Sequence, residues 1–255
     1  MAKGLKTVSS REFAEGGYRY IPGVFQYSGG VAAAEGYEIV RVTLRRPVPL
    51  AHGFARIEAH LSAVGRPKAA LCACELRSPA PFSEDGFRSF NEVYVVLLAA
   101  WGIYRDGVNP MARTNVCPLT DPPSEPGLHA FSYTIASQQR RAACVVSGSG
   151  EVPEGKSNYA DHIIRPGDTS IDGLRGKVEF VLATMEARLA SLGMTWIDVT
   201  STQIYTIHDI HPFLADLFVK RGAARFGVTW HYTRPPVAGL DFEMDCRGIS
   251  TEMIV

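Results

Sequence analysis

Glu58-Ala-His-Leu-Ser-Ala-Val-Gly65 recurs later in the chain as Glu186-Ala-Arg-Leu-Ala-Ser-Leu-Gly193, with Glu, Ala, Leu and Gly at the same spacing. Each stretch ends a segment whose apolar residues recur at helical spacing, which predicts an amphipathic helix. The closing glycine suits the left-handed turn that ends many helices. The apolar positions are Phe54, Ile57, Leu61 and Val64 in the first segment, and Leu174, Val178, Val181, Leu182, Met185 and Leu189 in the second.

The similarity continues on both sides of these helices. A short strand with Ser-Gly precedes each of them, at Tyr27-Ser28-Gly29 and Val146-Ser147-Gly148. After each helix the pattern predicts a strand, a second helix, a strand ending in Arg and a closing strand. Chance similarity between two α/β segments is the alternative. The predicted ranges are 70–76, 83–97, 111–113 and 128–135 in the first half, and 199–207, 209–218, 230–234 and 240–246 in the second.

This order predicts an α+β protein of two tandem domains, each running β-α-β-α-β-β with its helices on one face of a sheet. Residues 1–136 are expected to form the first domain, with an unrepeated extension over residues 1–25. Residues 142–255 are expected to form the second domain, and the polar stretch 136–141 the linker.

Composition excludes several classes of protein. Of 255 residues, 46% are hydrophobic, and 26 Lys and Arg balance 26 Asp and Glu. A disordered chain has fewer apolar residues, and a nucleic-acid-binding chain needs a basic excess. The run Tyr94–Tyr104 is shorter than the roughly 20 residues of a membrane-spanning helix. The first 13 residues lack an apolar signal region. Five cysteines, an odd number, suit a reducing compartment, so the chain is expected in the cytoplasm. Cys72 and Cys74 are expected to be buried thiols.

Arg234 follows Trp230 and Tyr232 at alternate positions, so a single strand would present all three side chains on one face. An Arg beside aromatic rings can bind a planar carboxylate through two hydrogen bonds while the rings hold an unsaturated chain. An ion pair with Asp or Glu at a domain interface is the alternative.

Glu243 lies between Phe242 and Met244, and strand alternation puts its side chain on the opposite face from both. A carboxyl group in apolar surroundings has a raised pKa and can serve as an acid or a base. An ordinary ion pair, with Arg234 for example, is the alternative. The turn from Pro235 to Gly239 is expected to bring the two strands together.

Other motifs predict no cofactor. His208 and His211 have a spacing that suits a metal, but no third ligand follows at ligand spacing, and no metal is expected. The chain has no dinucleotide-binding or phosphate-binding glycine loop. Ser147 has no evident His partner for a hydrolase triad, and Gly148-Ser-Gly150 reads as a turn.

Several motifs together resemble the Rid family of imine and enamine deaminases in a tandem arrangement. Phe90-Asn-Glu-Val-Tyr94 and Met111-Ala-Arg-Thr-Asn-Val116 are similar to its helix and arginine motifs in the first half. Val146-Ser147-Gly148 and Phe242-Glu-Met-Asp245 are similar to its early and closing strands in the second half. Within the family, His208-Asp-Ile-His-Pro212 and Asp241-Phe-Glu-Met-Asp-Cys-Arg-Gly248 are most similar to the two-half deaminases of 2-aminomuconate and 2-amino-5-chloromuconate.

The resemblance implies a chorismate-mutase-like fold, a homotrimer, and substrate sites at domain interfaces. It implies an Arg that binds the substrate carboxylate, carried by Arg234 and Arg113, and a Glu that positions water, carried by Glu243. Ser147 and Gly148 are then expected at the substrate as well. The expected reaction is hydrolytic deamination of an enamine or imine dicarboxylate without a cofactor, with a small carboxylate as the only partner. A general 2-imino acid hydrolase and a noncatalytic carboxylate-binding protein are the alternatives.

This chain departs from the family pattern in three ways. Asn115 and Pro236 stand where many members have Cys two residues after the Arg, and the loop between Arg234 and Glu243 is short. The closing strand of the first half, Leu128–Ile135, carries no carboxylate. The second half is therefore expected to hold the competent site.

Overall fold

Both copies of the repeated stretch end a helix, as their periodicity predicts. Helix α1 (Leu50–Ala63) buries Phe54, Ile57 and Leu61, and helix α3 (Ile171–Ser191) buries the apolar positions named above. Gly65 and Gly193 follow these helices with φ of 67° and 70°, the left-handed conformation that glycine adopts without strain.

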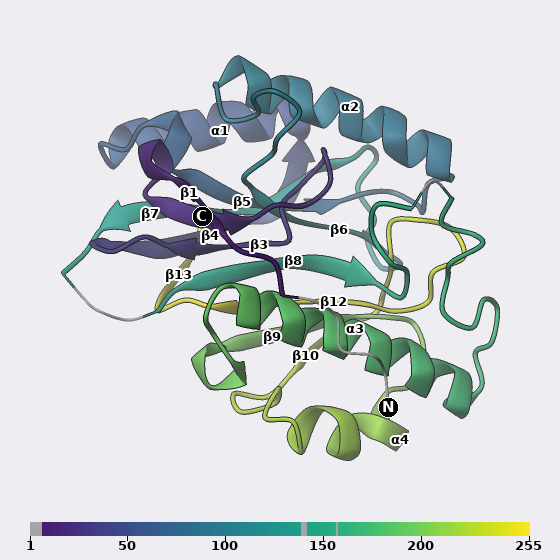
Figure 1. Cartoon of the computed structure of the whole chain (residues 1–255). Coiled ribbons are helices and arrows are strands. Elements are labelled where there is room, and N and C mark those ends of the chain that lie inside the picture. The colour runs from purple at the N-terminus through teal and green to yellow at the C-terminus, as the bar shows by residue number, and fades with distance from the viewer. Residues whose placement is uncertain (1–6, 139–141, 157) are drawn as a thin grey trace.

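In the computed structural model, which describes residues 7–138, 142–156 and 158–255, two sheets lie face to face between two layers of helices (Figure 1). Helices α1 and α2 (Glu84–Ala100) cover one sheet. Helix α3 and the short α4 (His211–Phe213), which continues as a π-helix over Leu214–Val219, cover the other. The fold is therefore mixed α+β, as the order of predicted elements indicates.

The first sheet has, among the described residues, the strand order β11-β6-β5-β7-β4-β13. Strands β5 and β6 are parallel, and β7 is antiparallel to both β4 and β5. Its strands are β4 (Tyr37–Pro49), β5 (Leu71–Arg77), β6 (Ala112–Pro118), β7 (Gly127–Ala136), β11 (Thr233–Arg234) and β13 (Thr251–Ile254).

The second sheet has the order β1-β2-β3-β8-β12-β9-β10 within the described ranges. Strand β12 lies between β8 and β9 and is antiparallel to both, which places Glu243 in the middle of the sheet. Its strands are β1 (Arg11–Phe13), β2 (Tyr18–Ile21), β3 (Gly30–Ala33), β8 (Cys144–Gly150), β9 (Ser201–Tyr205), β10 (Thr229–His231) and β12 (Glu243–Gly248).

Each sheet contains strands from both halves of the sequence. Strands β1 to β3 belong to the second sheet, where β3 pairs with β8, although their residues precede position 136. Strands β11 and β13 belong to the first sheet, where they pair with β6 and β4. The expected linker, 136–141, lies partly outside the described residues.

Three local expectations are wrong. Tyr27-Ser28-Gly29 precedes β3 and is not a strand, and the long β4 leads into α1 instead. The second helix of the second half begins at His211 rather than at Asp209, whose carboxylate accepts a hydrogen bond from the His211 N–H at 3.0 Å. The range 230–234 is two strands in different sheets, so Arg234 pairs with Cys117 of β6 and not with the strand of Glu243.

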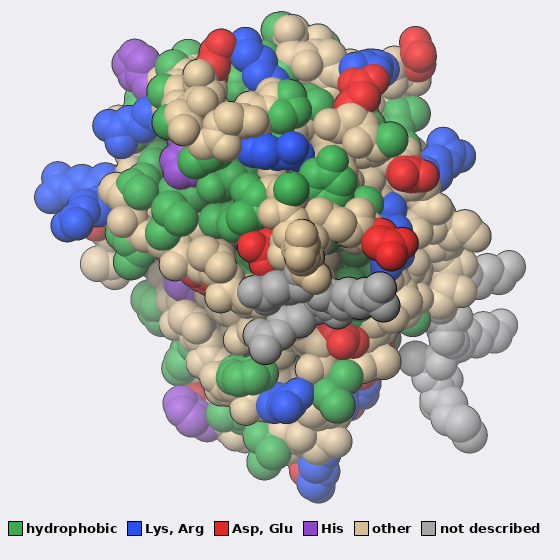
Figure 2. Space-filling view, turned by 90° about the vertical axis from the view of Figure 1, so that its left-hand side faces the viewer, with side chains coloured by type: hydrophobic (Ala, Val, Ile, Leu, Met, Phe, Trp, Pro, Cys, Tyr) green, Lys and Arg blue, Asp and Glu red, His purple; other side chains and the backbone are tan. Residues whose placement is uncertain are grey.

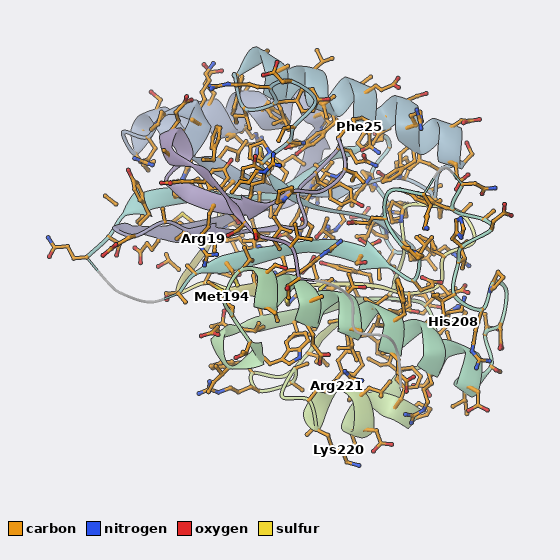
Figure 3. The ribbon with its side chains drawn as sticks, viewed as in Figure 1. Arg19, Phe25, Met194, His208, Lys220 and Arg221 are labelled. Atoms are coloured by element: carbon orange, nitrogen blue, oxygen red, sulfur yellow. The ribbon has the colours of Figure 1, made fainter. Side chains whose placement is uncertain are left out.

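Apolar side chains fill three layers. One cluster lies under α1 and α2 and another under α3 and α4. Between the sheets lie Tyr18, Tyr20, Val31, Ile39, Ala73, Ala112 and Val145 among others. Cys72 and Cys74 are buried free thiols, as their apolar surroundings predict. Arg19 of β2 donates a hydrogen bond to the Leu192 carbonyl at the end of α3, close to Met194 (Figure 3).

The surface carries both signs of charge. On the face in Figure 2, Lys and Arg side chains lie interspersed with Asp and Glu, and hydrophobic side chains gather in the upper half. Within the described ranges, no helix is both long enough and apolar enough to span a bilayer.

An ion network, buried except for Glu252, crosses between the sheets. Arg41 of β4 donates two hydrogen bonds to Glu75 of β5, at 2.6 and 2.7 Å. Glu252 of β13 accepts from Arg41 at 3.1 Å and from Arg247 of β12 at 2.7 Å. Removing one member of such a network leaves a buried charge without its partner.

We expect Glu75→Gln to lower the free energy of unfolding by about 3 kcal/mol at neutral pH, because Arg41 loses a buried ionic partner. Chemical denaturation would measure the change. The control is Glu58→Gln, which removes an ion pair with Lys68 whose side chains are 51% and 43% exposed, and which should cost less than about 1 kcal/mol. Equal decreases in the free energy of unfolding of the two variants would contradict a structural role for the network.

Candidate active site

A cavity lies where the second sheet meets β6 and helix α2. It contains about 480 Å³ of empty volume, part of which is open to solvent. We call it the Arg113–Glu243 cavity after two of its ionisable side chains. The lining residues come from the first half (Tyr27, Phe87, Arg113, Asn115), from β8 and β12 (Gly148, Ser149, Gly150, Glu243) and from connecting segments (Val152, Glu154, Tyr159, Pro236, Val237, Leu240).

Glu243 is the acid of this cavity. The residue is 4% exposed, on the face of β12 opposite Met244, as strand alternation predicts. A Cβ atom at Gly148 would collide with Glu243 Oε1, so the absence of a side chain there makes room for the carboxyl group. Burial raises the pKa of Glu243 well above its ordinary value, the charge of Asp245 raises it further, and Arg113 opposes both. The group is therefore suited to hold a proton near neutral pH.

Glu151 and Lys177 of α3 hold the residues that precede Glu243. Glu151 is fully buried and accepts hydrogen bonds from the backbone N–H groups of Asp241 and Phe242, at 2.6 and 3.1 Å. Lys177 of α3 lies 3.2 Å from Glu151 and 2.8 Å from Asp241. These contacts hold the start of β12 and hence the position of the Glu243 side chain.

Arg113 is the cation of the cavity, and the structure pairs it with no carboxylate within the described residues. Its guanidinium donates to Asn91 Oδ1 and lies 5.0 to 5.4 Å from the ring centres of Tyr27, Phe87 and Tyr94. Its Nε atom is buried and has no hydrogen-bond partner in the part of the chain that the structure describes. A buried guanidinium with an unused donor, held among aromatic rings, is suited to bind a carboxylate.

The remaining residues proposed from the sequence are divided between this cavity and other places. Ser147 does not line the cavity. Its hydroxyl donates to the Ser28 carbonyl at 2.6 Å and accepts from the Arg113 N–H at 3.1 Å. Trp230 is 38% exposed and donates to the Thr206 carbonyl, and Tyr232 is 57% exposed. Arg234 lies on β11, outside the cavity lining, so the structure does not bring it together with Glu243.

Residues from loops complete the site, and the sequence did not single them out. Glu154 forms an ion pair with Arg188 at 2.6 Å, and Arg188 also donates to the Ser147 carbonyl at 2.8 Å. Tyr159 lies on the same connecting segment, and its backbone N–H donates a hydrogen bond to the carboxylate of Glu84 on α2. For Asn115 the sequence did hold a signal. It lies two residues after Arg113 on one strand, so alternation places both side chains on the same face and indicates a shared site.

A wider cleft adjoins the cavity and shares Phe87 and Tyr159 with it. Phe25, labelled beside α2 in Figure 3, lies in its lining. The exposed cations Arg88 and Lys156 lie there as well, together with Glu84 and Asp85. The cavity therefore opens toward a charged surface.

The two histidines of the His208–His211 pair have separate partners. His208, labelled in Figure 3, lies 3.3 Å from Asp241, and His211 lies 2.6 Å from Asp209. Within residues 7–138, 142–156 and 158–255, no group of three or more His, Cys, Asp or Glu side chains has an arrangement that could hold a metal ion.

Comparison with known proteins gives one family and one close relative. Residues 10–253 match the family described as 2-aminomuconate deaminase CnbZ. The 2-amino-5-chloromuconate deaminase of Comamonas testosteroni is 51% identical over 245 residues, which are 95% of this chain and 98% of that protein. A solved structure of chorismatase has a TM-score of 0.45 and 14% identity, covering 89% of this chain and 78% of its own.

The raised pKa of Glu243 predicts a pH-dependent stability. Above about pH 4.5, the ordinary pKa, the carboxyl group ionises in the unfolded chain but stays protonated in the fold, so folding becomes less favourable as pH rises. Glu243→Gln removes this loss. Its free energy of unfolding relative to wild type should therefore increase with pH, by up to about 1.4 kcal/mol per pH unit.

Denaturation curves between pH 5 and 8 would measure the difference. Glu15→Gln is the control, because Arg105 lowers the pKa of the exposed Glu15 and its titration lies below this range in the folded chain. The difference for Glu15→Gln should stay constant across the range. A constant difference for Glu243→Gln as well would show that Glu243 is ionised in the fold.

Proposed function

Because the chain belongs to the 2-aminomuconate deaminase CnbZ family, we propose that it is a hydrolase that deaminates an enamine dicarboxylate. The substrates are 2-aminomuconate or 2-amino-5-chloromuconate, and the products are ammonia and a 2-oxo acid formed during degradation of aromatic compounds. The observation that supports this function best is the buried Arg113, with a free Nε donor in the described structure, in one cavity with the buried acid Glu243.

Arg113 binds the carboxylate next to the amino-bearing carbon. The rings of Tyr27 and Phe87 lie against the guanidinium and offer flat apolar surfaces to the conjugated carbon chain. The second carboxylate then points toward the adjoining cleft, where Arg88 and Lys156 supply positive charge. The same cleft also holds Glu84 and Asp85, so Arg88 and Lys156 are the specific groups that would bind the second carboxylate.

Glu243 supplies the proton chemistry. As a neutral acid it protonates the enamine at carbon, which converts the substrate to an iminium ion and leaves a carboxylate. The carboxylate accepts a proton as water adds to the iminium carbon. Glu243 then transfers the hydroxyl proton to nitrogen, and the C–N bond breaks with its electron pair on ammonia as the C=O bond forms. Glu243 ends in its starting, protonated form.

We expect Arg113→Ala to lower kcat/KM for ammonia release by about 30-fold to 5000-fold, corresponding to about 2–5 kcal/mol for a lost carboxylate partner. Glu243→Gln should lower kcat at least as strongly, because glutamine cannot donate and accept the proton. The measurement is ammonia released from freshly generated 2-aminomuconate by variants whose folding has been verified.

Arg234→Ala is the matched comparison, since Arg234 lies outside the cavity lining. A larger decrease in kcat/KM in Arg234→Ala than in Arg113→Ala would show that Arg234, and not Arg113, binds the carboxylate. Wild-type protein that hydrolyses 2-iminobutyrate but not 2-aminomuconate would favour a general 2-imino acid hydrolase. Release of ammonia from neither compound would favour a noncatalytic binding protein.

The tandem Rid architecture, the homotrimer and the cytoplasmic location belong to the same proposal. The order β4-α1-β5-α2-β6-β7 supports the Rid arrangement in the first half. Lining residues of the cavity come from both halves of the sequence, which is consistent with a substrate site between two Rid-like units. Light scattering tests the assembly: we expect a trimer, and a monomer with full activity would remove the trimer from the proposal.

A further inference from the structure

Asn115 lies on β6 two residues after Arg113, and both side chains line the Arg113–Glu243 cavity. The residue is 3% exposed. Its Oδ1 atom accepts a hydrogen bond from the hydroxyl group of Ser78, at 3.0 Å. Ser78 is fully buried, and its backbone N–H donates to the Val116 carbonyl at 2.9 Å. The Oδ1 atom of Asn115 is therefore held by a residue whose backbone is itself hydrogen-bonded.

The Nδ2 atom of Asn115 is buried and has no hydrogen-bond partner in the described structure. Buried amide donors are almost always paired, because water is lost on burial and must be replaced. Asn109, three residues before β6, shows the ordinary case: its amide donates to the Gln26 carbonyl at 2.9 Å and accepts from the Met111 N–H at 3.0 Å. An unused donor at a cavity wall indicates a ligand atom that accepts its hydrogen bond.

The proposed deamination requires such a donor. Arg113 is occupied by the substrate carboxylate, and Glu243 exchanges protons with carbon, oxygen and nitrogen in turn. Neither group stabilises the oxygen atom that enters from water. When Glu243 has moved the hydroxyl proton to nitrogen, this oxygen carries a full negative charge in the intermediate C(O⁻)(NH3⁺). A fixed amide donor stabilises such an oxygen far more than it stabilises the neutral substrate.

We propose that Asn115 is a catalytic residue whose Nδ2 group donates a hydrogen bond to the incoming water oxygen and to the alkoxide that forms from it. The inference rests on the proposed deaminase function and adds an oxygen-binding position to it. Carbon protonation by Glu243 involves no oxygen from water. Asn115 therefore acts on water addition and ammonia loss but not on the first step, and this separation can be measured.

The test follows the two steps separately in single turnovers, with enzyme in excess over 2-aminomuconate so that the imine stays bound. Loss of the absorbance of the conjugated enamine reports carbon protonation, and ammonia reports the completed reaction. Cyanoborohydride in the mixture reduces any accumulated iminium ion to a stable amine. For Asn115→Leu we expect absorbance loss within a few-fold of wild type, ammonia formation slower by about 100-fold to 1000-fold, and a corresponding yield of trapped amine.

Asn115→Ala removes the same donor without the larger side chain and serves if Asn115→Leu does not fold. Asn109→Ala is the matched control for loss of a buried asparagine: it should lower the melting temperature and yield no more trapped amine than wild type. If absorbance loss and ammonia formation slow equally in the Asn115 variants, or if neither changes, the inference is overturned while the deaminase function stands. A wild-type protein that releases no ammonia overturns both.

Discussion

The hydroxyl group of Ser147 joins the two sheets at the point where the candidate site forms. It accepts the backbone N–H of Arg113 from the first sheet and donates to the Ser28 carbonyl, beside the strand that pairs with β8. The next residue, Gly148, contacts Glu243. One buried hydroxyl thus fixes the position of the cation relative to the acid. Ser147 contributes through backbone positions rather than from the cavity wall.

Burial affects the two ionisable side chains Arg113 and Glu243 differently. Were Glu243 ionised, it would neutralise Arg113 and leave little attraction for an anionic ligand. Its raised pKa favours the neutral form, in which the guanidinium keeps its charge for a carboxylate from outside. The aromatic rings around Arg113 stabilise the cation without competing for its hydrogen-bond donors. Burial of the cavity therefore contributes both to carboxylate binding by Arg113 and to the protonated form of Glu243.

Sequence periodicity was sufficient for the elements with strong local patterns. Helices α1 and α3 and the orientation of Glu243 follow from spacing alone, because each depends on neighbours along the chain. The position of Arg234 could not be predicted, because β11 has only two residues and joins a sheet made mostly from the first half. Glu154 and Tyr159 were missed because they lie in an irregular segment with no periodic signal. The unused donor of Asn115 becomes visible only when its surroundings are known.

The exchange of strands between the sheets has a consequence for biosynthesis. Strand β4 near residue 40 pairs with β13 at residues 251–254, and β3 pairs with β8. On the ribosome, the N-terminal strands β1 to β3 must wait for β8, and the long strand β4 stays unpaired on one side until residues 251–254 have been made. An exposed edge on a partly made chain invites pairing with other nascent chains. Demand for chaperones should therefore concentrate on the interval before the last strand emerges.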